Sequence, residues 1–134
     1  MKVIVPLVDG FEEIEFNTIV DILRRAGIDV TTAGLKDSLI EGAHGVKVMP
    51  DISIDKITPG DFDVVVLPGG YPGFENLGKD ERVLNLVREM DKAGKYVTAI
   101  CSSPSVLSKA GIVKGRKATI HPAAREMPCE RPLK

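Results

Sequence analysis

The stretch "FDVVVLPGG" at residues 62–70 is the clearest buried strand in the sequence. Four apolar residues stand in a row, and Pro-Gly-Gly ends the run at once. A strand that is apolar on both faces is typical of a parallel sheet with helices on both sides. Around this stretch, apolar β-rich runs alternate with helical patterns, so the sequence predicts an α/β fold.

Other segments extend this pattern in both directions. We expect further strands at 2–8, 27–34, 45–51, 95–100 and 116–120, and helices at 12–26, 80–93 and 104–111. Pro6 lacks a backbone N–H, which argues against a fully central position for the first strand. The order of the elements favours an open parallel sheet, which binds its ligands beyond the carboxyl ends of the strands.

The composition is that of an ordinary globular protein. The 134 residues suit a single domain over 1–134, and 18 basic residues face 19 acidic ones. This balance gives no reason to expect nucleic acid or an anionic membrane as a partner. No apolar run approaches the roughly 20 residues of a membrane helix. Two cysteines make no disulfide framework and no zinc motif, so we expect a cytoplasmic protein without a metal site.

Four polar segments follow the predicted strands. They are "DGFEE" at 9–13, "PGGYPG" at 68–73, "CSSP" at 101–104 and "HPAAR" at 121–125. Because the carboxyl ends of parallel strands share one edge of a sheet, these segments are expected to lie together there. The sequence thus predicts that a glutamate, a cysteine and a histidine converge.

Cys101 is the first candidate for chemistry, because it stands where a strand runs into a helix. Ala99 and Ser103 are small, as the tight turn of a nucleophile elbow requires. Ser103 is expected to cap the helix, and Pro104 suits its first position. A helix N-terminus favours the thiolate. The alternative is that Cys101 is simply a small buried side chain.

Glu15 is the second candidate. At helical spacing it shares one stripe with Ile19 and Ile22, so it is the carboxylate expected to point inward, whereas Glu13 points to the opposite face. Burial would favour the protonated form, which donates a hydrogen bond. The alternative is a surface acid that the helix dipole stabilises.

The remaining polar residues near this edge have weaker signals. Asp9 and Glu12 have the spacing of a capping box, which explains them without function. The glycines of 68–73 allow backbone N–H groups to hold an oxyanion, or they form an ordinary turn. His121 is a general base or a polar loop residue, and His44 has no strong chemical case.

Together, five segments resemble the ThiJ/PfpI superfamily, and within it the Parkinsonism-associated deglycase branch. They match in order and spacing over essentially the whole chain, and they are "DGFEEIEF", "DILRRAGIDV", "DVVVLPGG", "AICSSPSVL" and "ATIHPAAREM". The resemblance implies a flavodoxin-like (Rossmann-like) α/β sandwich that forms a homodimer.

The same resemblance implies roles for individual residues. Cys101 would be the nucleophile, Glu15 the acid hydrogen-bonded to it, and His121 the nearby histidine. The pocket would be lined by the backbone of Gly69, Gly70 and Ser102. The chain departs from the family in two respects. Ser102 stands where the peptidase branch has a histidine, and the chain stops at "CERPLK", apparently without the family's C-terminal strands and helix. The missing cover would expose apolar surface on the sheet.

Three functions follow from these features. The first is a cofactor-independent glyoxalase or deglycase that acts on 2-oxoaldehydes, or on glycated protein or nucleotide, through a hemithioacetal on Cys101. The second is an oxidation sensor or redox-regulated chaperone in which Cys101 becomes a sulfinate beside Glu15. The third is a cysteine peptidase, which the serine at position 102 disfavours.

Overall fold

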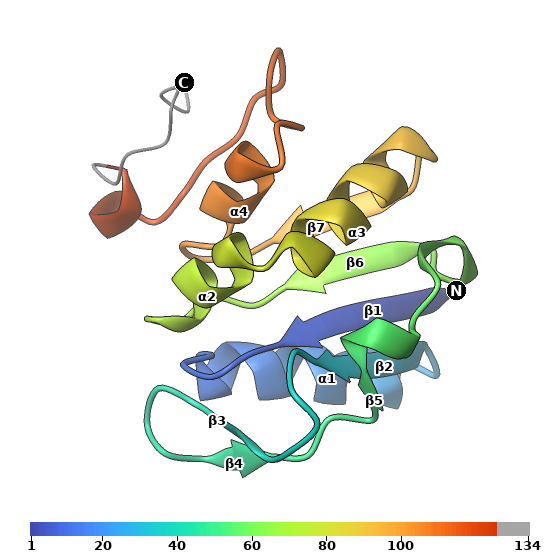
Figure 1. Ribbon diagram of the computed structural model, residues 1–134, viewed down its shortest axis with the longest axis vertical. Helices are drawn as coiled ribbons and strands as arrows, with labels where there is room; N and C mark the ends of the chain where they lie inside the picture. The colour runs from blue at the N-terminus through green and yellow to red at the C-terminus, as the bar shows by residue number, and fades with distance from the viewer. Residues whose placement is uncertain (126–134) are drawn as a thin grey trace.

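A computed structural model describes residues 1–125 of the chain (Figure 1). Its centre is a five-stranded sheet with the strand order β5-β2-β1-β6-β7, in which every pair of neighbours is parallel. These strands are β1 (Lys2–Leu7), β2 (Asp29–Gly34), β5 (Ile52–Ser53), β6 (Val64–Leu67) and β7 (Tyr96–Ala99). The predicted α/β fold with a mainly parallel sheet is confirmed.

Helices cover both faces of the sheet (Figure 1). One face packs against α1 (Glu13–Arg25), and the other packs against α2 (Gly73–Lys79), α3 (Glu81–Lys92) and α4 (Pro104–Lys109). Single 3-10 turns follow at η1 (Ile54–Lys56), η2 (Pro59–Asp61) and η3 (Pro122–Ala124). None of the helices within residues 1–125 has the length and apolar character to cross a bilayer.

The alternation of side chains along β1 explains the two cores. Val3 and Val5 pack with Phe16 of α1, whereas Ile4 lies between them on the other face and packs with the cluster around Val87 of α3. All five side chains are at most 3% exposed. A strand that is buried on both faces must be apolar at every position, and this is the pattern that the sequence shows.

The expected position of β1 was wrong, because this strand is the middle one of the sheet. Its pairing with β6 covers only Val3 and Ile4. On the other side, the carbonyl of Leu7 accepts a hydrogen bond from Leu35 beyond the end of β2. Since the backbone N–H groups of successive strand residues point to alternate sides, the missing N–H of Pro6 is on the β6 side, where the pairing ends after Ile4, while the pairing with β2 continues to Leu7.

Three further expectations need correction. The segment 116–120 is not a strand, because its backbone pairs with no other strand in the described part of the chain. Of the expected strand 45–51, only β4 (Lys47–Val48) forms, and it pairs antiparallel with β3 (Ile40–Glu41) outside the main sheet. The helix α2 was not predicted, because its glycines and the preceding Pro72 are typical of a turn.

Exposed apolar surface is present on the edge strand β7, where Tyr96 is 68% exposed, and just beyond it at Ile100, which is 45% exposed.

Candidate active site

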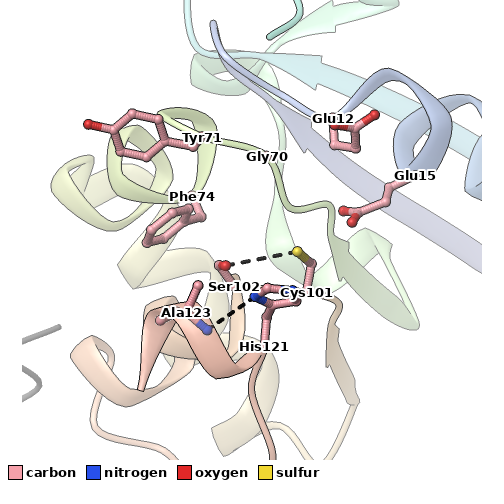
Figure 2. A pocket seen from close by; sticks show the side chains of 10 residues that line it. Glu12, Glu15, Gly70, Tyr71, Phe74, Cys101, Ser102, His121 and Ala123 are labelled. Carbon is pink, nitrogen blue, oxygen red and sulfur yellow. Dashed lines mark hydrogen bonds between the residues drawn. The ribbon is translucent and has the colours of Figure 1, made fainter. Parts of the chain in front are cut away.

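A pocket of about 340 Å³ lies beyond the carboxyl ends of the strands (Figure 2). The loop after β1 and the start of α1 contribute one side of it, the loop after β6 and α2 contribute another, and the turn after β7 contributes the floor. Its lining includes Glu12, Glu15, Gly70, Cys101, Ser102 and His121. The predicted glutamate, cysteine and histidine therefore do meet at one edge of the sheet.

Cys101 has a left-handed backbone with φ 61°, which no other non-glycine residue among 1–125 adopts. The turn is held on both sides: the N–H of Ser103 donates to the carbonyl of Ile100 at 3.0 Å, and the N–H of His121 donates to the carbonyl of Cys101 at 2.9 Å. A side chain at positive φ costs about 1 kcal/mol or more, so this conformation persists only because the surroundings fix it. The strain and the half-buried thiol are those expected of a nucleophile elbow.

This strain predicts an unusual order of stability. Cys101→Gly is expected to be at least as stable as Cys101→Ala in urea unfolding, because glycine adopts φ 61° without steric penalty. At Thr18, which is exposed in the middle of α1, Gly is expected to be less stable than Ala by about 1 kcal/mol. The same 1 kcal/mol disadvantage for glycine at Cys101 would show that the left-handed backbone is not strained.

Ser103 does not cap α4 as expected. Its backbone is already helical, and its hydroxyl donates instead to the carbonyl of Pro68 at 2.5 Å. The side chain is fully buried, so this hydrogen bond ties the turn after β7 to the loop after β6. Pro104 does occupy the start of the helix, as predicted. Ser103 therefore fixes the position of the elbow and not the end of the helix.

Glu15 and Cys101 lie on the two sides of Gly69. The Oε2 of Glu15 accepts a hydrogen bond from the N–H of Gly69 at 2.7 Å. A Cβ added to Gly69 would lie 2.6 Å from that oxygen and 2.7 Å from the Cβ of Cys101, so only glycine leaves room between the two side chains. Figure 2 shows the carboxyl group of Glu15 directed toward the thiol. Within residues 1–125, however, the hydrogen-bonding neighbour of the Cys101 Sγ is the Oγ of Ser102 at 3.9 Å, and not Glu15.

The prediction that Glu15 lies on the inward face of the first helix, in one stripe with Ile19 and Ile22, is only partly correct. Phe16 and Val20 form the buried face of α1, whereas Ile22 is 57% exposed. Glu15 lies at the margin of this face, half-buried, where it reaches the pocket. Its orientation follows from the bond to Gly69 more than from burial of the helix face.

Two of the three predicted backbone donors at the pocket are without a partner among residues 1–125. Gly69 uses its N–H for Glu15, which removes it from the expected set of donors. The N–H groups of Gly70 and Ser102 donate to no acceptor in the described part of the chain. Gly70 adopts φ +103°, which brings the backbone of this loop against Glu12. Unpaired N–H groups beside a thiol are what an oxyanion requires.

His121 lies at the exposed side of the pocket (Figure 2). Its Nδ1 accepts a hydrogen bond from the N–H of Ala123 at 3.3 Å, which leaves the proton of the neutral ring on Nε2. The backbone bond from His121 to the carbonyl of Cys101 fixes the segment beside the elbow. A ring in this position can exchange protons with a ligand in the pocket.

Sequence reasoning missed the pair formed by Glu13 and His44. Glu13 is buried, and its Oε1 accepts from the N–H of His44 at 2.6 Å, while its Oε2 lies 3.0 Å from the His44 Nδ1. The expected capping box is wrong as well, because the Oδ1 of Asp9 accepts a hydrogen bond from the N–H of Glu41 instead.

Glu12, Glu13 and His44 place one ligand atom each within 4.8 Å of one another, and are the set among residues 1–125 that could hold a metal ion. No local pattern reveals this group, because His44 is 31 residues from Glu13 in the sequence.

Hydrogen bonds shift the pKa values of this pair apart. Burial alone would raise the pKa of Glu13, but the hydrogen bonds from the His44 ring and from the N–H groups of His44 and Val46 lower it to about 2. The hydrogen bond to Glu13, together with the charges of Glu13 and Glu12, raises the pKa of His44 above 6.5. The contacts between the two side chains therefore favour the charged form of each group.

These shifts predict a maximum in stability. The contribution of Glu13 is present above its unfolded pKa of 4.5 and is lost as the pH falls through about 2. The contribution of His44 is present below its unfolded pKa of 6.5 and is lost as the pH rises through its higher folded pKa. The urea midpoint is therefore expected to be highest between pH 4.5 and 6.5, and Glu13→Gln is expected to flatten both limbs. Parallel profiles for both proteins would show that the pair does not contribute.

Comparisons with known proteins agree with this geometry. A sequence model of the DJ-1/PfpI family matches residues 1–129. The chain belongs to the DJ-1/PfpI family. It is 40% identical over 123 residues to the protein dj-1beta of Drosophila melanogaster, covering 91% of this chain and 66% of the fly protein. It is 35% identical over 126 residues to a deglycase of Pyrococcus horikoshii, covering 94% of this chain and 75% of the archaeal protein.

A solved structure of the same family has the same fold. The oxidized DJ-1 of Toxoplasma gondii matches with a TM-score of 0.88 and 33% identity, covering 99% of this chain and 74% of that protein. The chain thus spans about two thirds to three quarters of the length of these relatives. Membership of the ThiJ/PfpI superfamily, predicted from the sequence motifs, is confirmed.

Proposed function

We propose that this DJ-1/PfpI chain is a cofactor-independent enzyme that acts on 2-oxoaldehydes, or on their adducts with amines, through Cys101. The observation that carries the proposal is the left-handed turn at Cys101, which presents the thiol in a pocket shared with Glu15. The relative from Pyrococcus horikoshii, which is named a deglycase, supports the same class of chemistry. The homodimer and the cytoplasmic location stay predictions.

The reaction begins with addition of the Cys101 thiolate to the aldehyde carbon. A C–S bond forms, and the electron pair of the C=O bond moves to the oxygen, which carries a negative charge in the transition state. The unpaired N–H groups of Gly70 and Ser102 are suited to stabilise this charge. Protonation of the oxygen then gives a neutral hemithioacetal.

The later steps need only proton transfers and water. With methylglyoxal, the proton on the first carbon is removed, and a proton returns to the second carbon, which gives a thioester of lactate. Water hydrolyses the thioester, releasing lactate and restoring the thiol. Glu15 faces Cys101 across Gly69, and His121 lies at the open side, so these two groups are the proton carriers in this scheme.

An amine adduct of the aldehyde can enter the same sequence. The thiolate displaces the amine from the adduct carbon, and the amine leaves with a proton that His121 or Glu15 supplies. The product on the enzyme is again the hemithioacetal on Cys101. One site thus serves both glyoxalase and deglycase chemistry.

The experiment that tests this proposal compares two substrates. We expect the chain to convert methylglyoxal to lactate and to leave casein intact, because Ser102 provides no imidazole directly beside the nucleophile for amide cleavage. Hydrolysis of casein that depends on Cys101, with no lactate formed, would refute the proposal in favour of a peptidase.

One observation favours an oxidation sensor as the second candidate. A sulfinate on Cys101 would find the hydroxyl of Ser102 next to it and the same two backbone N–H groups. The solved structure from Toxoplasma gondii is described as oxidized. No turnover of either substrate, together with accumulation of a sulfinate at Cys101 in mild peroxide, would replace the enzyme by the sensor.

A further inference from the structure

The ionisable side chains of the pocket have an uneven charge. Two of them, Glu12 and Glu15, carry carboxyl groups, and His121 at the exposed side is the one basic residue among the described residues that line the pocket, which include no lysine or arginine. Arg125 follows the last lining residue along the chain, but it is exposed and does not line the pocket. The whole chain has a formal net charge of -1, so no strong positive field compensates for these acids.

Glu12 is held at the pocket by contacts at both ends of the residue. Its N–H donates to the carbonyl of Gly69 at 2.9 Å, and its Oε1 accepts from the N–H of Ile14 at 3.3 Å. Its side chain is 25% exposed, so it is neither buried in the core nor free in solvent. Glu12 thus has a fixed place in the lining of the pocket that also contains Cys101 (Figure 2).

The nearest basic side chain pairs with Glu13 more closely than with Glu12. The His44 Nδ1 lies 3.7 Å from the Glu12 Oε2, but it lies only 3.0 Å from the Oε2 of Glu13. His44 is therefore the partner of the buried Glu13, and Glu12 has no closer basic partner among residues 1–125. The carboxylate that lines the pocket is thus the less compensated of the two.

The facing wall is aromatic. Tyr71 and Phe74 line the pocket, with ring centroids 6.3 Å apart and an angle of 48° between the ring planes (Figure 2). Aromatic faces attract cations and accept neutral apolar groups, but they offer nothing to an anion. The two sides of the pocket therefore discriminate in the same direction.

We propose that Glu12 makes this pocket selective for charge, so that neutral and cationic carbonyl compounds reach Cys101 and anionic ones are excluded. The consequence for substrates rests on the proposed function. Aldehyde adducts on the guanidinium of arginine or the amine of lysine are accepted. Adducts on nucleotides, phosphorylated sugars and 2-oxo acids are rejected.

Charged thiol reagents test this selectivity without any turnover. The trimethylammonium-ethyl and sulfonatoethyl methanethiosulfonates both form a mixed disulfide with a thiolate and release methanesulfinate, but they carry opposite charges. With Cys129→Ser as the background, Cys101 is the single thiol. The measured quantity is the rate with the cationic reagent divided by the rate with the anionic one, normalised to the same ratio for 2-mercaptoethanol. We expect this normalised ratio to be about ten for Cys101, because the nearby negative charge attracts one reagent and repels the other.

The variants identify the source of the preference. Glu12→Gln is expected to reduce the ratio of the two rates by at least about threefold. Glu89→Gln removes the same charge from an exposed position near the C-terminal end of α3, which lies at the opposite ends of the strands from the pocket (Figure 1). This variant is expected to leave the ratio of the two rates unchanged. High salt is expected to weaken the preference in the parent chain by screening.

The outcomes separate this inference from the proposed function. The role of Glu12 is overturned if the normalised ratio of cationic to anionic rates is one or less in the parent chain, or if it is equal in the parent chain and in Glu12→Gln. This holds even if methylglyoxal is consumed. The expected ratios without any conversion of methylglyoxal would support the selectivity and refute the enzyme. With turnover present, faster release from the nucleotide adduct than from the N-acetylarginine adduct would contradict the substrate class.

Discussion

Replacing Cys101 by serine is expected to lower kcat/KM for methylglyoxal by at least about a thousandfold, with the fold intact. A serine hydroxyl has a far higher pKa than a thiol, and within residues 1–125 the hydrogen-bonding neighbour of the sulfur is the Oγ of Ser102, which is not a base that would activate it. The exchange of one atom keeps the size of the side chain and the left-handed turn. Lactate formation from methylglyoxal is the measurement.

Cys129 provides the matched control. Cys129→Ser removes the other thiol of the chain, at a position outside the described residues, and is expected to keep the activity of the parent. The two serine variants differ only in which thiol is lost. Activity in Cys101→Ser within tenfold of the control would show that the elbow cysteine is not the nucleophile.

Gly70→Ala is expected to have the largest effect on stability, a loss of about 3 kcal/mol or more. A Cβ at this position would lie 2.2 Å from the backbone N of Glu12 and 2.7 Å from the carbonyl O of Gly10. These neighbours are backbone atoms, which cannot turn away as a flexible side chain can. The left-handed φ of +103° adds strain of its own.

Gly60→Ala is the control for this substitution. Gly60 has open space around its Cβ position and no left-handed φ, so the exchange there is expected to change stability by less than about 1 kcal/mol. Urea unfolding of the two variants gives the difference. If Gly70→Ala is as stable as Gly60→Ala, the close approach of the loop after β6 to the start of α1 is not correct, and the placement of Glu12 and Glu15 fails with it.

The parts of the site that the sequence predicts are those that depend on local pattern and on sheet topology. The alternation of strands and helices predicts the parallel sheet, and the rule for its carboxyl edge brings Cys101, Glu15 and His121 to one pocket. The small residues around Cys101 predict the turn, because a bulky neighbour would collide there. Each of these inferences needs only residues close in the sequence, or the order of the elements.

The parts that escaped prediction depend on contacts between distant segments. Ser103 looks like a helix cap, but the fold brings the carbonyl of Pro68 within reach and the hydroxyl binds it instead. Glu13 looks like a surface acid until the turn at His44 folds over it. The run 116–120 has the residues of a strand, but a strand needs a partner, and its neighbours in the described chain provide none. Local preference is a weak guide wherever tertiary contacts decide.

The central claim is that Cys101 forms a covalent hemithioacetal with a 2-oxoaldehyde. Carbon NMR with methylglyoxal that is isotopically labelled at the aldehyde carbon tests it directly, using Glu15→Gln to slow the later proton transfers and Cys129→Ser to leave Cys101 as the single thiol. We predict one new resonance of a tetrahedral carbon bonded to sulfur, equal in amount to the protein, which is absent when Cys101→Ser is added to the same variant. The same resonance in the absence of the Cys101 thiol, or no resonance in its presence, would contradict the account.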